Sequence, residues 1–189
     1  HRPFLIGGYM RLGIISDTHG SLYFFEKAME ILEDCDRIIH AGDVLYHGPR
    51  NDIPGGYDPK GLSARMNDMK NIYIARGNCD SPVDEMVIKH PFQDPCLLLE
   101  FNDRKIFVTH GYTESKLAMI YRAKEAGADI LIYGHTHIKE MSRDDEIMIL
   151  NPGSTSIPKD GIRSCAIIDT DCAELWDIEN AVMLQRIQF

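Results

Sequence analysis

Short apolar runs of strand length recur through the first part of the chain, each bounded by polar or glycine-containing residues. They predict strands at 12–16, 37–40, 71–75, 96–100, 105–110 and 130–135. Between the early runs, apolar residues recur at helical spacing over 22–33 and, more weakly, over 62–69. Ser21 suits the N-cap of the first helix, and a third helix is expected over 115–125. This alternation predicts an α/β fold for the front of the chain.

The last quarter of the chain has a different pattern. Its β-rich segments are separated by Asp and Asn and lie at 146–150, 165–169, 175–178 and 183–187. Such spacing favours hairpins over further strand–helix alternation, so we expect an antiparallel C-terminal part. The longest irregular segment is 46–61, YHGPRNDIPGGYDPKG, and long loops in compact domains are often functional.

Length and composition indicate one domain, because 189 residues with 44% apolar residues can bury a single core. No apolar run is long enough to span a bilayer. Residues 1–9, HRPFLIGGY, precede a methionine and have no signal-peptide pattern. We interpret them as a remnant of the expression vector outside the fold, which excludes His1 as a ligand, and place the domain at 10–189.

Charge and cysteine content narrow the function further. The five cysteines are odd in number and form no C-x-x-C pair, which argues against disulfides and thiolate zinc sites and favours the cytoplasm. The net charge is −9 and there is no basic run, so neither duplex nucleic acid nor a membrane is an expected partner. A small anion can still bind if local metal ions outweigh the negative field.

Five short motifs follow predicted strands and carry the candidate chemistry. They are Asp17-Thr18-His19, Gly42-Asp43, Gly77-Asn78-Cys79-Asp80, His110-Gly111 and Gly134-His135-Thr136-His137. Each one alone could be a turn or a structural histidine. Because loops at the carboxyl ends of strands line one crevice in an α/β sheet, the five together predict a shared site.

The ligand inventory of this site is two carboxylates, four imidazoles and one amide. Mixed nitrogen and oxygen ligands suit Mn, Fe, Zn, Ni or Co better than Ca or Mg. Seven side chains are too many for one ion, but with a shared carboxylate they divide into two sites. A metal pair about 3.5–4 Å apart is an arrangement that clamps the oxygens in phosphate ester cleavage.

The motif series resembles the calcineurin-like metallophosphoesterase superfamily over residues 12 to about 160. The segments GPRNDIPGGYDP, RGNCD and NPGSTSIPK are similar to the small bacterial and archaeal phosphodiesterases of the YfcE type. The resemblance implies a four-layer αββα sandwich with mixed sheets. It also implies a phosphodiesterase that hydrolyses small phosphodiesters by attack of a metal-bridging hydroxide, and it suggests a homo-oligomer. The alternative is a non-catalytic interaction scaffold of the same fold.

The resemblance also implies a metal assignment, with Mn²⁺ as the customary ion. Asp17, His19 and His137 would hold one metal. Asn78, His110 and His135 would hold the second, and Asp43 would bridge the two.

The chain departs from the superfamily at Cys79, where most members read GNH. A thiol is a poor general acid compared with imidazole, so we expect activity to depend on good leaving groups such as aryl oxides; the alternative is a small packing residue. We count Cys79 and Asp80 as candidate catalytic residues.

Arg50, His47 and Arg76 are candidates for binding phosphate oxygens. Two further histidines, His40 and His90, are expected to be structural.

Overall fold

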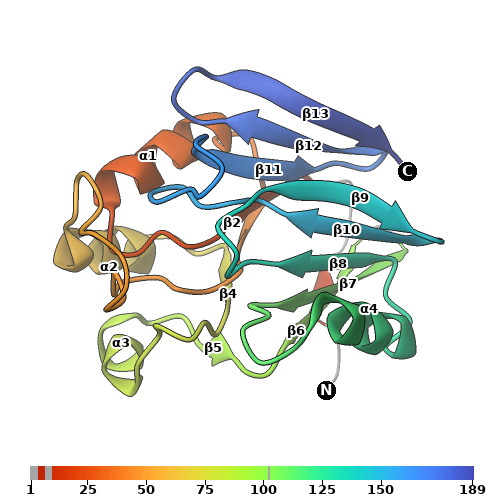
Figure 1. Ribbon diagram of the computed structural model, residues 1–189, viewed down its shortest axis with the longest axis horizontal. Coiled ribbons are helices and arrows are strands. Elements are labelled where there is room, and N and C mark those ends of the chain that lie inside the picture. Colours follow the sequence, from red (N-terminus) through yellow and green to blue (C-terminus); the bar gives the residue numbers. More distant parts are fainter. Residues whose placement is uncertain (1–3, 7–9, 102) are drawn as a thin grey trace.

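The computed structural model describes residues 4–6, 10–101 and 103–189. Within these residues, two β-sheets face each other and carry helices on their outer sides (Figure 1). The larger sheet has the order β13-β12-β11-β2-β3-β4-β5, and the smaller sheet has the order β1-β6-β7-β8-β10-β9. The αββα sandwich expected from the sequence is confirmed.

The larger sheet combines a parallel half with an antiparallel half. Its strands are β2 (Leu12–Ile15), β3 (Arg37–His40), β4 (Ile72–Ala75), β5 (Phe92–Gln93), β11 (Ser164–Ile168), β12 (Cys172–Asp177) and β13 (Val182–Gln188). Strands β2 to β5 are parallel, with Ile14 opposite Ile39 and Ile38 opposite Ile72. Strands β11, β12 and β13 are antiparallel, and β11 also runs antiparallel to β2. The expected change of pattern toward the C-terminus is therefore present in this sheet.

The smaller sheet differs from expectation at its edges. Its strands are β1 (Phe4–Ile6), β6 (Leu97–Phe101), β7 (Arg104–Thr109), β8 (Ile130–Tyr133), β9 (Glu140–Asp144) and β10 (Ile147–Asn151). Strand β10 pairs in parallel with β8 and forms a hairpin only with β9, which the sequence pattern did not predict. Residues 4–6 pair with β6, so this part of residues 1–9 does not lie outside the fold. The remainder of that segment, His1 included, lies outside the described residues.

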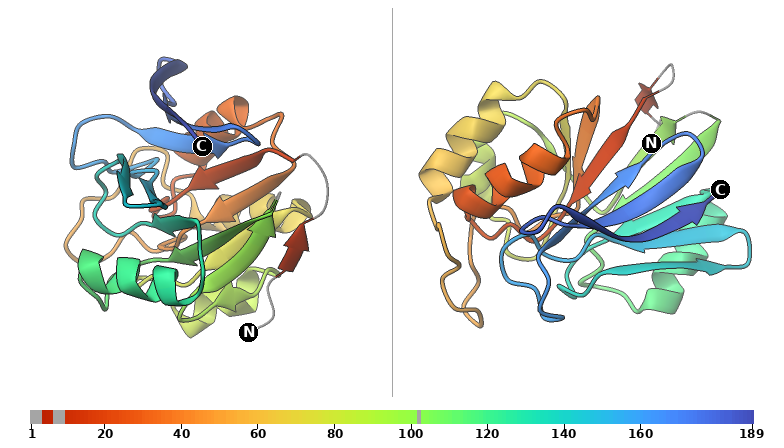
Figure 2. Two further views of the ribbon diagram at one scale, coloured as in Figure 1. Left: turned by 90° about the vertical axis from the view of Figure 1, so that its right-hand side faces the viewer. Right: turned by 90° about the horizontal axis from the view of Figure 1, so that it is seen from above.

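Three apolar clusters hold the layers together. The cluster between the sheets includes Leu12, Ile14, Phe101, Ile106 and Leu150, all fully buried. A second cluster packs helices α1 (Leu22–Ile31) and α2 (Pro59–Asp68) against the larger sheet, and a third packs α4 (Lys116–Glu125) against the smaller sheet. Figure 2 shows these helices on the two outer sides. The helices thus leave the carboxyl ends of the central strands free to form a site.

The helix boundaries follow from local capping. The Ser21 and Ser115 side chains accept hydrogen bonds from the first turns of α1 and α4, as N-caps do. Helix α2 begins earlier than predicted because Asp58 caps it and Pro59 occupies its first turn. The irregular loop therefore ends at Asp58 rather than at Gly61. Short helix α3 (Pro82–Val87) was not predicted, although Ser81 and Asp84 form a capping box at its start.

Candidate metal centre

The five predicted motifs meet at one end of the sandwich. Asp17 and His19 follow β2, Asp43 follows β3, and Asn78 follows β4, all in the larger sheet. The smaller sheet supplies three histidines, which are His110 after β7 and His135 and His137 after β8. Both carboxylates therefore come from one sheet, and three of the four imidazoles come from the other. The site is complete only when the two sheets are packed together.

Five side chains form a compact buried cluster, which we call the buried centre: Asp17, His19, Asp43, His110 and His137. The Nε2 atom of His137 lies 3.2 Å from Asp17 Oδ1 and 3.2 Å from His19 Nε2. The Nε2 atom of His110 lies 3.3 Å from Asp43 Oδ2. The Nε2 atom of His19 lies 3.7 Å from a carboxylate oxygen of each aspartate. Ligand atoms thus converge from several directions on a small volume.

Backbone carbonyls orient the three imidazoles of the buried centre. The Nδ1 atoms of His19, His110 and His137 lie 2.7, 2.7 and 2.8 Å from carbonyl oxygens of Tyr46, Ala41 and Ile157. Since a carbonyl oxygen only accepts, each Nδ1 carries a proton, and Nε2 is the atom that can bind a metal. This arrangement is typical of histidines that bind metals through Nε2.

The carboxylates are also held on one side and left free on the other. Asp17 Oδ2 accepts hydrogen bonds from Ser16 Oγ at 2.6 Å and from the His135 backbone N–H at 3.1 Å. Asp43 Oδ1 accepts one from the Cys79 backbone N–H at 2.7 Å. Within the described part of the chain, Asp17 Oδ1 and His110 Nε2 are buried without any hydrogen-bond partner. Because buried polar atoms are rarely left unpaired, these two atoms fit direct binding of a cation.

The electrostatics of the buried centre favour positive charge. Burial opposes ionisation of Asp17, but the nearby imidazoles of His110, His137 and His19 keep its pKa well below the ordinary value. Burial likewise opposes a charge on His110, but Asp17 and Asp43 raise its pKa to about 9. The two closely spaced buried carboxylates thus favour protonation of His110 and His19, whose pKa values are raised. A divalent cation would compensate the same negative charge without these protons.

The backbone of the site is held in an uncommon conformation. Among the described residues, positive φ angles occur at Asp17 (53°), His19 (44°), Asp43 (60°), His135 (65°) and His137 (57°). Residues other than glycine adopt this region rarely and at a cost in free energy, and such residues concentrate at functional sites. The left-handed conformations turn successive side chains toward one centre directly after their strands.

Glycines of two motifs allow the loops to approach closely. A Cβ at Gly77 would collide with the Asp43 carboxylate and backbone nitrogen, and one at Gly134 would collide with Ser16 Oγ. This explains why glycine precedes Asn78 and His135.

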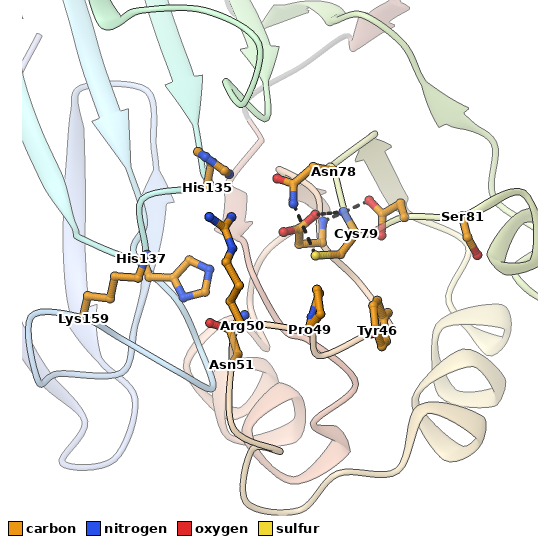
Figure 3. A pocket seen from close by; sticks show the side chains of 13 residues that line it. Tyr46, Pro49, Arg50, Asn51, Asn78, Cys79, Ser81, His135, His137 and Lys159 are labelled. Carbon is orange, nitrogen blue, oxygen red and sulfur yellow. Dashed lines mark hydrogen bonds between the residues drawn. The ribbon is translucent and has the colours of Figure 1, made fainter.

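The remaining predicted ligands lie at the edge of the buried centre. His135 is half-buried, with its ring centroid 5.3 Å from that of His110. Asn78 is exposed, and its amide donates to Cys79 Sγ at 3.3 Å. Both line a pocket of about 720 Å³ that opens over His137 and Asp43 (Figure 3). That volume lies within the usual range for small-molecule sites.

The candidate catalytic residues differ in their environment. Cys79 lines the pocket, and its sulfur lies within 4.8 Å of ligand atoms of His19 and Asp43. Asp80, in contrast, accepts hydrogen bonds through its carboxylate from the backbone N–H groups of Asp43, Val44 and Gly77, at 2.7–2.9 Å. Asp80 also lines the pocket, but its oxygens join two loops. This placement favours a positioning role, and the catalytic role stays a prediction.

The three candidate phosphate-binding residues are separated by the structure. Arg50 extends from the irregular loop toward the space between His135 and Asn78 (Figure 3). His47 is not among the pocket-lining residues and has 3.5 Å between its Nδ1 and the Tyr57 hydroxyl. Arg76 forms an ion pair with Glu85 and also does not line the pocket. Arg50 is thus the candidate that the pocket exposes to a phosphate, and the roles of His47 and Arg76 stay predictions.

Several functional positions had no clear signal in the sequence. Lys159 lines the pocket opposite Tyr46 (Figure 3). Ser154 Oγ donates to the Asp17 carbonyl at 2.7 Å, and Asn151 Nδ2 donates to the Gly134 carbonyl at 2.9 Å. All three belong to the segment NPGSTSIPK, which we noted only for its resemblance.

His40 and His90 hydrogen-bond to Thr18 and to the Met66 carbonyl, in agreement with structural roles.

The protein is thus a sandwich of two sheets, and the buried centre, a candidate metal site, lies at one end of it. Residues 10–173 match the profile of the calcineurin-like phosphoesterase superfamily domain. The chain belongs to this superfamily, whose members depend on divalent metal ions to cleave phosphoric esters.

Individual relatives give the same result. The phosphodiesterase YfcE of Escherichia coli K12 is 38% identical over 185 residues, covering 94% of this chain and 97% of the relative. A phosphodiesterase of Methanocaldococcus jannaschii is 30% identical, covering 89% and 98%. The solved structure of E. coli YfcE covers 94% of this chain and 98% of its own, with a TM-score of 0.83 and 33% identity. Vacuolar protein sorting 29 of Cryptosporidium parvum, at 18% identity and a TM-score of 0.70, covers 96% and 98% and shares the fold.

Proposed function

We propose that this chain is a phosphodiesterase that hydrolyses small phosphodiesters with two divalent cations, Mn²⁺ first among them. The observation that carries the proposal is the convergence of three oriented imidazole Nε2 atoms and two carboxylates. Two of these atoms, Asp17 Oδ1 and His110 Nε2, are buried and lack hydrogen-bond partners. The names of the E. coli and M. jannaschii relatives support diesters as the substrate class.

The proposed ligand sets follow the geometry. Asp17, His19 and His137 would hold one cation. His110, His135 and Asn78 would hold the other, and Asp43 would bridge, since its Oδ2 faces both His19 and His110. When bound, the cations would lower the pKa of a water to about 7 and offset charge on the phosphoryl oxygens.

The chain's own residues perform the remaining tasks. The backbone carbonyls of Tyr46, Ala41 and Ile157 hold the imidazoles in the metal-binding tautomer. Arg50 has no carboxylate partner among the residues that the structure describes, so its guanidinium is available to an anionic substrate. Cys79 lies where a proton donor to the leaving group would be useful, but a thiol donates weakly. We therefore propose that the enzyme works best on esters of acidic alcohols.

The test combines metal analysis with turnover. After chelation and reloading, the protein should bind two Mn²⁺ per chain by calorimetry and hydrolyse bis(4-nitrophenyl) phosphate only when loaded. The His110→Gln variant should lose at least one ion. His90→Gln, which alters a histidine bonded to the Met66 carbonyl far from the site, should retain both. Tight metal binding without turnover of any phosphoric ester would instead support the interaction scaffold.

Two further expectations accompany this proposal. Among the described helices, none has both the length and the apolar character required to cross a bilayer. All five cysteines lie in the described residues and are unpaired there, which supports a cytoplasmic location. Assembly into a homo-oligomer remains a proposal, which light scattering of the purified protein would test.

A further inference from the structure

A second hollow adjoins the metal-site pocket. Its volume is about 410 Å³, and its apolar lining consists of Leu45, Tyr46, Tyr57, Pro59 and Val87. Tyr46 and Ser81 line both spaces, so the two share a wall. In Figure 3 these two residues lie on the opposite side of the pocket from His137 and Lys159. A substrate centred on the metals therefore meets Lys159 on one side and this hollow on the other.

The walls of the hollow are fixed in place by contacts to the rest of the protein. The Tyr46 carbonyl accepts the Nδ1 proton of His19, which ties this wall to the buried centre. The Tyr57 ring lies so close to Gly20 that a Cβ there would collide with it. The Val87 carbonyl accepts a hydrogen bond from Asn67 Nδ2 at 2.7 Å. The hollow thus exists before any ligand binds, which lowers the entropic cost of filling it.

The lining of the hollow is mainly apolar and aromatic, and its polar members are Lys60, which is exposed, Ser63, Ser81 and Asp84. Asp84, the acidic group of the hollow, is buried, and its Oδ2 accepts a hydrogen bond from the Ser81 backbone N–H. The Tyr46 and Val87 side chains are 42% and 47% exposed, so apolar surface remains in contact with solvent. Tyrosine rings favour flat π-systems by stacking and edge contacts. These features suit an aryl group or a nucleobase.

We propose that this hollow, the Tyr46–Val87 hollow, is a subsite for an aromatic ester arm of the phosphodiester. The inference rests on the proposed function, because it assumes that a phosphoryl group sits at the metals. It adds the substrate class: diesters with at least one aromatic arm bind more tightly than those with only small alkyl arms. Burying a single ring should raise affinity roughly tenfold.

The experiment measures binding of non-hydrolysable probes, so it does not depend on turnover. Phenylphosphonate and methylphosphonate carry the same charge and differ only in the arm. Calorimetry on the Mn²⁺-loaded protein should give a dissociation constant about tenfold lower for phenylphosphonate. In Val87→Trp, which fills the hollow, the ratio should fall to about one, and methylphosphonate should bind as before. Val87→Ser should lower the ratio about threefold.

Val83 provides the matched control. It is 63% exposed on the same short helix but does not line the hollow. Val83→Trp and Val83→Ser should leave both constants unchanged. Equal affinity of the two probes for the wild type, or equal effects of the Val87 and Val83 changes, would overturn the subsite while leaving phosphodiesterase activity intact. Absence of binding by either probe, together with absence of diester turnover, would overturn the proposed function and the subsite with it.

Discussion

The buried centre and the exposed rim of the pocket are constructed in different ways. At the centre, Asp17, Asp43 and His110 are at most 2% exposed, and their positions are fixed by short hydrogen bonds to the backbone or to Ser16. At the rim, Arg50 and Lys159 are exposed. The difference indicates that the centre is built for geometry and the rim for adaptable contact with substrate. Substitutions at the centre should therefore act through metal binding, and substitutions at the rim through substrate affinity.

The largest effect is expected at Asp43, whose two oxygens face the Cys79 backbone and the imidazoles of the centre. Asp43→Asn keeps the shape but removes a negative charge, so the second cation should bind poorly. We expect kcat/KM for bis(4-nitrophenyl) phosphate to fall by on the order of 10³-fold, since the metals contribute several kcal/mol. Steady-state kinetics with saturating Mn²⁺ checks this.

Asp34→Asn is the matched control, because the Asp34 carboxylate is exposed in the turn that follows α1. It should leave kcat/KM unchanged. If Asp43→Asn retains more than about a tenth of the activity, Asp43 does not bridge the two cations.

A smaller effect is expected one step away from the ligands, at Asn151. Its side chain is fully buried and donates to the Gly134 carbonyl and to Thr136 Oγ1, which supports the loop bearing His135 and His137. Residues that orient metal ligands typically affect affinity by about 10–100-fold, so Asn151→Ala should weaken Mn²⁺ binding by that factor. Calorimetric titration checks it. Unchanged Mn²⁺ affinity with a lower melting temperature would show a purely structural role.

The same contrast explains what the sequence could predict. The ligands of the buried centre follow strands whose apolar runs are clear, and parallel strands bring their carboxyl ends together, so the meeting of Asp17 and Asp43 was foreseeable. His110 joins them from the other sheet, through a packing of the two sheets that the strand pattern does not specify. The rim depends on tertiary context. The ion pair of Arg76 with Glu85 on α3 depends on contacts that the sequence pattern does not predict. The same holds for the hydrogen bonds that the Asp80 carboxylate accepts from the backbone.

Short or polar elements escaped prediction for a related reason. Strand β9 reads Glu-Met-Ser-Arg-Asp, with little apolar alternation, and forms only because it pairs with β10. Helix α3 has only six residues, too few for a helical period to be visible. The parallel pairing of β8 with β10 also depends on the whole sheet and not on either strand alone.

Cys79 lies between centre and rim, and its replacement tests whether chemistry can be improved there. Burial, followed by the nearby Asp43 carboxylate, raises the pKa of the thiol to about 12, so it remains protonated and weakly donating. In the wild type, rates should fall steeply as the pKa of the leaving alcohol rises. Cys79→His should raise turnover of alkyl esters by about tenfold to a hundredfold and change that of 4-nitrophenyl esters little.

The measurement is a series of diesters that share one arm and differ in the leaving group. A wild-type rate that is independent of leaving-group pKa would contradict the interpretation of Cys79 as a weak donor. Cys79→Ser serves as the control for size, since a hydroxyl should leave the slope unchanged.

The smallest effect is expected at Arg50, which should act on substrate affinity alone. Its exposed guanidinium can bind a phosphoryl oxygen by a charge-assisted hydrogen bond, but solvent competes with that bond. Arg50→Ala should raise KM roughly tenfold and leave kcat within about twofold, the signature of lost uniform binding. Arg186→Ala removes another exposed arginine, on β13, where Glu174 is its partner, and should change neither constant. A fall in kcat for Arg50→Ala without a change in KM would instead show that Arg50 binds the transition state. An exposed residue of the rim would then contribute to the chemical step, which we assign to the buried centre alone.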